Sequence, residues 1–179
     1  MPGVTNSSIS DRLVLITSFA QGFPVTETLI SEGQYIRAAA ILKQDYEIVA
    51  RLSEVRAGKA KRGIQPNVKH APTGSQRFYG ELNAVAHPAN EHILVDLLAR
   101  LDRGDINGLS PIPEFNRDIA RSLYELHVFT LLEIVREALQ LYAEMYPNEL
   151  EAVVPALELF RTAVGFVEKV GFVVESRSK

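Results

Sequence analysis

The sequence predicts an all-α protein, a single-domain helical bundle of five to seven helices with one basic loop rich in glycine and proline. Apolar residues recur at helical spacing along most of the 179 residues, and no stretch shows a sustained period-two alternation. Turn-forming residues cluster in two places, 58–74 and 102–113. The chain has no cysteine, but it is long enough to bury a sizeable core without disulfides or a structural metal.

The N-terminal third predicts two helical elements before a long helix. The first follows from the spacing of Leu13, Ile16, Phe19 and Ala20. Pro24 fits the first turn of the next element. Gly33 interrupts that element, because Ser31 and Gln34 have the S-x-x-Q spacing of a capping box that starts a new helix.

The new helix is expected over 34–58, with two different faces. Its apolar face consists of Ile36, Ala39, Leu42, Tyr46, Val49 and Ala50. Another face carries alternating charges three or four residues apart, namely Lys43, Glu47, Arg51 and Glu54. Such a stripe is typical of a solvated face with weak ion pairs.

Three further helices are expected over 75–86, 90–100 and 114–146. The last of these is apolar nearly all round, which predicts that it is central in the fold or shares a face with a second subunit. A final helix starts either at Asn148, capped with help from Glu151, or at Pro155, and ends near Gly171. Residues 172–179 form a tail of the single domain 1–179.

Composition restricts the class of protein. The charged fraction of 23% is too low and too mixed for a disordered chain, and the net charge is −3. The first 12 residues have no basic segment of the kind that begins a signal peptide, and the apolar run behind them, "LVLITSFA", covers eight residues. We therefore expect no membrane span and a cytoplasmic location.

The loop region is unusually basic. No acidic residue occurs in the 26 positions between Glu54 and Glu81, whereas 114–168 contains ten acids and four arginines. The basic residues of this region are Arg56, Lys59, Lys61, Arg62, Lys69, His70 and Arg77. The pattern predicts that 58–74 is a mobile loop and that 56–77 binds an anionic or nucleic-acid partner, with Lys59, Lys61 and Arg62 as ligand-binding residues. A helix with a basic C-terminus followed by a soluble loop is the alternative.

The stretch "FYGELNAVAHPANEH" (78–92) holds a second candidate site. Tyr79, Asn83 and His87 follow one another four residues apart, as a polar stripe beside an apolar helix face. Pro88 places His87 at the helix end, where an imidazole bonds free carbonyls. The same three side chains can bind an anion or transfer a proton, so His87 and Tyr79 are candidate catalytic residues. We expect packing to bring His87 against Glu47 as its carboxylate partner.

The sequence predicts no metal site and no cofactor. His87 and Glu91 are four residues apart, as are His92 and Asp96, but Pro88 breaks the helix that the first pair would need. Neither H-E-x-x-H nor E-x-x-H occurs. A Gly-rich phosphate loop and a G-x-S-x-G motif are also absent from the sequence, so an ordinary kinase or hydrolase is not supported.

Two segments, "YIRAAAILKQDYEIVARL" and "FYGELNAVAHP", resemble a loose group of uncharacterised bacterial all-helical proteins. These proteins show an Arg/Lys-x-x-x-Glu helix and then an aromatic, a short polar residue and a histidine on a second helix. The matching positions, over about a third of the chain, are Lys43, Glu47, Tyr79, Asn83 and His87.

Some relatives are similar to the HEPN superfamily, helical domains that often act as ribonucleases in toxin and phage-defence systems. Their hallmark is an arginine, four to six residues, and a histidine, which "RSLYELH" matches with Arg121 and His127. The resemblance implies a metal-independent ribonuclease in which His127 is the acid–base group and Arg121 holds phosphate charge.

Two classes of function therefore remain open. The first is an interaction module, a homodimer formed through the helix over 114–146, which binds an anionic ligand. The second is a HEPN-like ribonuclease. The sequence leaves open whether the protein is an enzyme.

Overall fold

The structure is a computed structural model that describes residues 3–71, 76–87, 90–98, 100–103 and 106–170. These residues form six α-helices and one short hairpin, which confirms the all-α single-domain bundle. The helices are α1 (Ser7–Ser31), α2 (Tyr35–Arg56), α3 (Gln76–Ala86), α4 (Glu91–Leu97), α5 (Arg117–Met145) and α6 (Val154–Lys169). Two 3-10 turns, η1 (Val68–His70) and η2 (Leu150–Val153), precede α3 and α6. The strands are β1 (Arg100–Arg103) and β2 (Ile106–Leu109).

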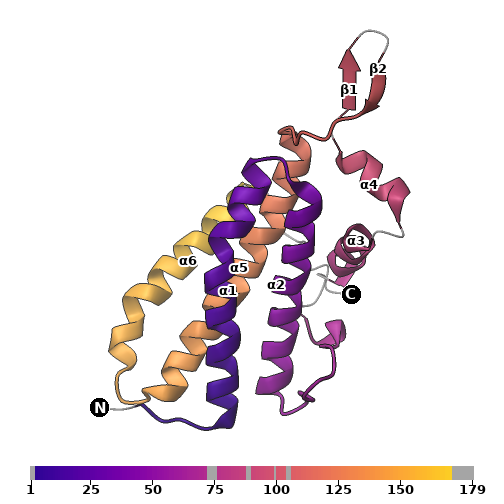
Figure 1. The fold of residues 1–179 in the computed structure, drawn as a ribbon. Coiled ribbons are helices and arrows are strands. Elements are labelled where there is room, and N and C mark those ends of the chain that lie inside the picture. Colours follow the sequence, from indigo (N-terminus) through magenta and orange to yellow (C-terminus); the bar gives the residue numbers. More distant parts are fainter. Residues whose placement is uncertain (1–2, 72–75, 88–89, 99, 104–105, 171–179) are drawn as a thin grey trace, which may run out of the picture.

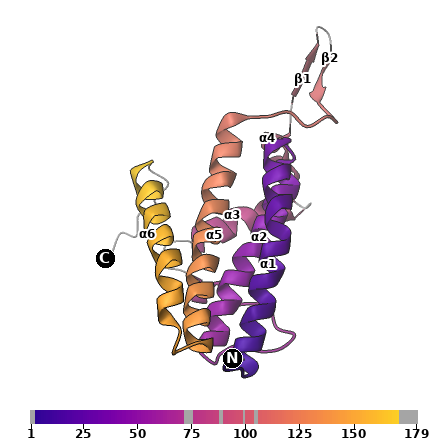
Figure 2. The same cartoon turned by 90° about the vertical axis from the view of Figure 1, so that its left-hand side faces the viewer.

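Three long helices, α1, α2 and α5, lie side by side and enclose the core (Figure 1). α3 packs on α2, and α6 lies along the outer side of α5 (Figure 2). The hairpin projects from the end of the bundle where α5 begins. The core consists of four apolar clusters that are built mainly from these three helices and from Leu82 of α3.

α1 is one continuous helix, so the predicted break before Pro24 is wrong. Asn6 caps it by accepting the Ile9 N–H at 2.9 Å. The residues that α1 turns toward the bundle follow a three–four spacing, namely Ile9, Arg12, Ile16, Phe19, Phe23, Thr26 and Ile30. This seam passes Pro24 without interruption, and the burial along it offsets the hydrogen bond that the proline removes.

The turn between α1 and α2 does not use the predicted capping box. The Ser31 hydroxyl donates back to the Thr28 carbonyl, and Gln34 makes no side-chain cap. Instead, the N–H groups of Gly33 and Gln34 bond the carbonyls of Ile30 and Leu29, as in a Schellman motif. Gly33 has φ +73°, and a Cβ there would lie 2.4 Å from the carbonyl oxygen of Glu114. Only glycine therefore fits between this turn and the segment before α5.

α2 confirms the predicted helix and its apolar face. Leu42, Tyr46 and Ala50 are fully buried. The charged stripe is not a plain solvated face, because Glu54 is only 5% exposed. The physical reason is that the loop after α2 folds back over Glu54 and uses its carboxylate.

The region after α3 differs from the prediction. The helix expected over 90–100 ends at Leu97, and Arg100 begins a strand. Part of the turn-rich segment 102–113 forms the antiparallel hairpin, in which Arg100 is paired with Leu109 and Arg103 with Ile106. The strand ladder satisfies backbone groups that a longer α4 would otherwise have paired.

α5 is central, as predicted. Asn116 caps it by accepting the N–H groups of Asp118 and Ile119. No large apolar side chain of α5 is among the exposed ones, because α1, α2 and α6 surround the helix. α6 begins at Val154 with Pro155 in its first turn, which confirms the second of the two predicted starts.

Within the described residues, α1 is long and apolar enough to cross a membrane, with a mean hydropathy of 1.4 over its most apolar 18 residues. Membrane spans, signal sequences and core helices share this property. The cytoplasmic location therefore stays a prediction. The tail 172–179 lies outside the described residues.

Candidate functional site

The polar stripe of α3 lies against the polar flank of α2, as predicted, and Tyr79 makes the contact. The Tyr79 hydroxyl donates to Glu47 Oε1 at 2.9 Å. Gln65, from the loop after α2, donates from Nε2 to the same oxygen and to the Tyr79 hydroxyl, both at 2.8 Å. Lys43 Nζ lies 3.8 Å from Glu47 Oε1 and 5.9 Å from the centroid of the Tyr79 ring. Three separate segments of the chain therefore converge on Glu47.

This environment fixes the protonation of Tyr79. Burial, and then the hydrogen bond to Glu47 and its charge, raise the pKa of Tyr79 to about 12, while the bond from Gln65 opposes the shift. Tyr79 therefore keeps its proton at physiological pH. It can act as a hydrogen-bond donor there, and it does not provide a general base.

Arg51 and Glu54 fasten the loop to α2. Arg51 Nη1 donates to Glu54 Oε2 at 2.7 Å and to the Lys61 carbonyl at 3.3 Å, and Nη2 donates to the Ile64 carbonyl. Glu54 Oε1 accepts the backbone N–H of Asn67 at 2.7 Å. Hydrogen bonds with a charged partner are stronger than neutral ones, so they hold the loop backbone in a defined position.

The predicted ligand-binding cations Lys59, Lys61 and Arg62 are exposed on this anchored loop. No ion pair within the described part of the chain includes any of them. Glu47 and Glu54, the acids of α2 that face the loop, already accept bonds from other groups. The three cations therefore give the loop an uncompensated positive charge. We call Lys59, Lys61, Arg62, Gln65 and Tyr79 the loop surface.

Other members of the predicted basic region are placed differently. Arg56 turns toward α5 and pairs with Glu137, so it is not part of the loop surface. The side chain of Arg77 and residues 72–74 lie outside the described parts of the structure. The mobility of 58–74 stays a prediction, and the anchors from Arg51 and Glu54 restrict it.

Replacing Arg51 by methionine is expected to loosen the loop. The carbonyls of Lys61 and Ile64 lose a charged donor, and such bonds contribute about 1.5 kcal/mol or more each. We expect trypsin to cleave the loop about tenfold faster, because local opening becomes more frequent. Limited proteolysis with mass spectrometry measures the rate. The control is Arg37→Met, an exposed arginine near the other end of α2, and equal cleavage of the two variants would contradict the anchoring role.

His87 follows the last residue of α3, but it does not form the predicted pair with Glu47. Its side chain is exposed, and Nε2 lies 3.2 Å from Asn83 Oδ1. No ion pair of His87 occurs among the described residues. The free carbonyl of Ala84 is bonded by the Asn90 side chain at 2.9 Å, so Asn90 provides the cap that was expected of His87. Tyr79 lies two turns nearer the start of α3 and reaches Glu47 in its place.

Arg121 and His127 do not share a surface in this chain. Arg121 is exposed on α5, with Nε 2.9 Å from Glu125 Oε1. His127 is 1% exposed and stacks on Phe23 of α1, with 4.5 Å between ring centroids. Burial lowers the pKa of His127 to about 4, and neither ring nitrogen has a hydrogen-bond partner among the described residues. His127 is therefore a neutral core residue here.

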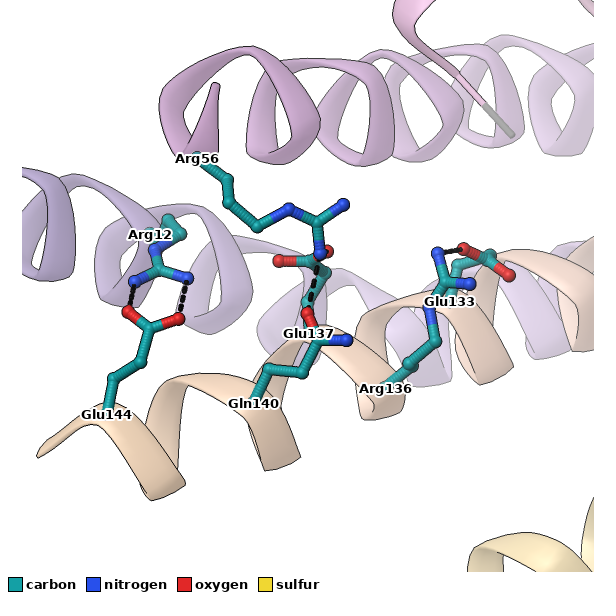
Figure 3. A network of polar contacts seen from close by, with 7 residues as sticks. All are labelled: Arg12, Arg56, Glu133, Arg136, Glu137, Gln140 and Glu144. Carbon is teal, nitrogen blue, oxygen red and sulfur yellow. Dashed lines mark hydrogen bonds and ion pairs between the residues drawn. The ribbon is translucent and has the colours of Figure 1, made fainter. Parts of the chain in front are cut away.

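A second polar cluster, which the sequence analysis missed, lies between α1, α2 and the C-terminal half of α5 (Figure 3). Arg12 donates through both Nη atoms to the two carboxylate oxygens of Glu144. Arg56 Nη1 donates a hydrogen bond to Gln140 Oε1 at 2.5 Å. The same nitrogen lies 2.5 Å from Glu137 Oε1 and forms an ion pair with it, but this contact does not have the geometry of a hydrogen bond. The cluster joins the three core helices at one end of the bundle.

The same cluster continues one turn along α5, where Arg136 donates to Glu133. Burial raises the pKa of Glu133, and the charge of Glu137 adds to the shift, whereas Arg136 opposes it. Three arginines face three glutamates in Figure 3, so the charges balance. Such a cluster suits the alignment of helices better than the capture of a charged ligand.

Asp45 is a further buried acid that the sequence analysis did not single out. It is 4% exposed on α2, and its Oδ2 has no hydrogen-bond partner within the described residues. Burial raises its pKa to about 7, and the nearby hydroxyl of Thr26 on α1 opposes the shift. Asp45 and His127 are thus two titratable groups in the core, and neither reaches the loop surface.

A groove of about 390 Å³ lies at the opposite end of α2 from the loop surface, lined by residues 33–37, 97–98 and 110–113. None of the predicted site residues lines it. No group of three or more histidine, aspartate or glutamate side chains suited to a metal occurs in the described ranges.

Comparison with known proteins gives no match to this chain, whether to a protein-family model, to a curated protein or to a solved structure. The resemblance to uncharacterised bacterial helical proteins and to HEPN domains therefore stays a prediction.

Proposed function

We propose that the chain is an oligomeric interaction module whose loop surface binds an anionic, phosphate-rich partner. The observation that carries the proposal is the set of three exposed cations, Lys59, Lys61 and Arg62, on an anchored loop without an acidic partner among the described residues. A phosphate-rich chain is attracted by such a cluster, and its binding releases condensed counterions.

Two features around the cations support binding rather than simple solvation. The anchors from Arg51 and Glu54 hold the loop before a partner arrives, which lowers the entropy lost on binding. Tyr79, which Gln65 contacts, offers an aromatic ring beside the loop, and the exposed His87 lies two turns further along α3. Aromatic rings next to cations stack with bases of single-stranded nucleic acid. Single-stranded RNA is therefore the first probe.

Replacing Lys59, Lys61 and Arg62 together by alanine is expected to weaken RNA binding by at least about tenfold. Each cation that neutralises a phosphate of a single strand adds about 0.7 to the slope of log affinity against log salt. With three such contacts, binding by the unaltered chain should fall roughly tenfold or more between about 50 and 200 mM salt. The triple variant should lose most of this dependence. Fluorescence anisotropy with a labelled RNA oligomer measures both quantities.

The matched control removes three other exposed arginines, Arg37, Arg117 and Arg161, which lie on α2, α5 and α6 away from the loop. It changes the net charge by the same amount. Equal losses of affinity in the two triple variants would show a general charge effect and would count against the loop surface. Binding of the unaltered chain that does not change with salt would reject the electrostatic mechanism.

The HEPN-like ribonuclease stays the alternative, and the same labelled RNA tests it. Within one chain, the burial of His127 does not favour it. Cleavage of the RNA that disappears in the Arg121→Ala/His127→Ala variant would support the ribonuclease. Binding without cleavage supports the interaction module.

We also propose that the chain forms a homodimer. The sequence predicted a dimer formed through the apolar helix over 114–146. In the structure, however, the apolar side chains of α5 are covered by the neighbouring helices of the same bundle. Large exposed apolar side chains occur instead on α6, which lies along the outer side of α5 (Figure 2). Exposed apolar surface of this kind is typical of an interaction site.

A further inference from the structure

α6 carries an exposed apolar stripe along its outer face. Leu159 is 71% exposed, Phe166 is 64% exposed and Val170, at the helix end, is 38% exposed. At about 100° per residue, the three side chains fall within about 40° of one another around the helix axis. Single exposed apolar residues are ordinary on protein surfaces, but a stripe on one helix face is a feature of helix–helix contacts.

Opposite charges stand at the two ends of one flank of this stripe. Glu158 and Lys169 are both exposed, and by helical spacing both lie about 90° from Leu159 in the same direction. They are separated by roughly 16 Å along the helix, too far to pair with each other. Neither forms an ion pair within the described part of the chain.

We infer that the occupant of this face is α6 of a second copy of the chain, packed antiparallel. Two helices related by a two-fold axis present the same flank to the same side, so residues near one end meet residues near the other end. With the axis between Ala163 and Val164, Glu158 lies beside the partner's Lys169, and the same pair forms a second time. Leu159 then falls between the partner's Phe166 and the partner's Val170.

Charge complementarity selects this arrangement. In a parallel pair the two-fold axis would place the two copies of this flank on opposite sides of the contact, so Glu158 and Lys169 would both stay unpaired. The inference rests on the homodimer in the proposed function and adds its surface and orientation. Because one helix of 16 residues provides a smaller contact than a standard interface, we expect a dimer with a dissociation constant in the micromolar range.

Charge reversal tests the pairing without removing any buried side chain. The variants Glu158→Lys and Lys169→Glu each create two like-charge pairs and should weaken the dimer by about tenfold or more. The double variant Glu158→Lys/Lys169→Glu restores opposite charges and should return the dissociation constant to within about threefold of the unaltered chain. Sedimentation equilibrium of the full chain measures each constant. Glu168→Lys, on the opposite side of α6, is the control and should leave the dimer unchanged.

The outcomes separate this inference from the homodimer proposal. A dimer that both single variants leave intact would overturn the α6 interface while the homodimer stands. A chain that remains monomeric up to about 100 μM, above the expected micromolar range, would overturn both. If that monomer binds lipid vesicles and Phe166→Ser abolishes the binding, the stripe belongs to a membrane contact and the second copy is rejected. RNA binding by the loop surface is measured separately and is affected by none of these results.

Discussion

Replacing Glu144 by alanine is expected to lower the free energy of unfolding by about 3 kcal/mol, although Glu144 itself is half exposed. The effect arises at Arg12, whose side chain is 3% exposed and depends on Glu144 for both of its Nη atoms. Arg12 Nε has no hydrogen-bond partner among the described residues. Without Glu144, the structure would bury an unpaired guanidinium, which costs far more than the loss of a surface ion pair.

The reverse substitution separates burial from pairing. Arg12→Met leaves Glu144 at the surface, where water solvates it, and should cost only about 1 kcal/mol. The double variant Arg12→Met/Glu144→Ala should be nearly as stable as Arg12→Met alone, because no buried charge is left unpaired. Urea denaturation followed by circular dichroism gives the three values, with the exposed acid Glu149→Ala as control. Equal costs for the two single variants would contradict the role of the buried arginine.

The break predicted in α1 shows where local signals mislead. Pro24 favours a helix start, so it directed the interpretation toward a boundary. The stronger signal is the three–four spacing that runs from Ile9 to Ile30 across the proline. That seam includes Arg12 and Thr26, two polar residues, and a search for apolar residues alone does not detect it. The packing of the whole face determines the helix, rather than the preference of one residue.

The candidate site was predicted in part, for a physical reason. Helical spacing placed Lys43 and Glu47 on one flank of α2 and Tyr79 on the facing flank of α3, and the structure brings them together. The contributions of Gln65 and Arg51 could not be derived this way. Both connect a loop to a helix over 10 to 18 residues, and such bonds follow no periodic pattern in the sequence.

Some polar residues occupy positions on the buried face of a helix, among apolar residues spaced three and four apart. The sequence analysis did not use these residues, although they indicate polar contacts in the core. Asp45 lies among apolar residues spaced three and four apart on α2, as His127 and Glu137 do on α5. A polar residue at such a position is costly, so it is informative about what it meets in the core. Extending each seam through its polar members would have predicted both the cluster of Figure 3 and the buried Asp45.

Replacing Asp45 by asparagine is expected to stabilise the protein at pH 8 by about 2 kcal/mol. Burial raises the Asp45 pKa from 3.8 to about 7, so the folded state holds this proton more tightly than the unfolded chain does. As the pH rises from about 4 to above 7, the folded state therefore loses about 4 kcal/mol. Asparagine has no charge to bury, although its amide needs a partner beside Thr26, which reduces the net gain.

His127 provides the opposite pH dependence and makes the test specific. The pKa of His127 is lowered from 6.5 to about 4. Its contribution to the free energy of unfolding is therefore complete above about pH 6.5 and is lost as the pH falls toward 4. In the unaltered chain, the effects of Asp45 and His127 on the free energy of unfolding have opposite signs between about pH 4 and 6.5. The free energy of unfolding should therefore change little over this range and decrease above it. In Asp45→Asn only His127 remains, so stability should rise by about 3 kcal/mol from pH 4 to 6.5 and then stay level. Urea denaturation at about pH 4.5, 6.5 and 8 distinguishes the two profiles, with Asp11→Asn, an exposed acid, as control. If Asp45→Asn kept the profile of the unaltered chain, Asp45 would be charged in the folded protein at low pH, and its burial would not govern its titration.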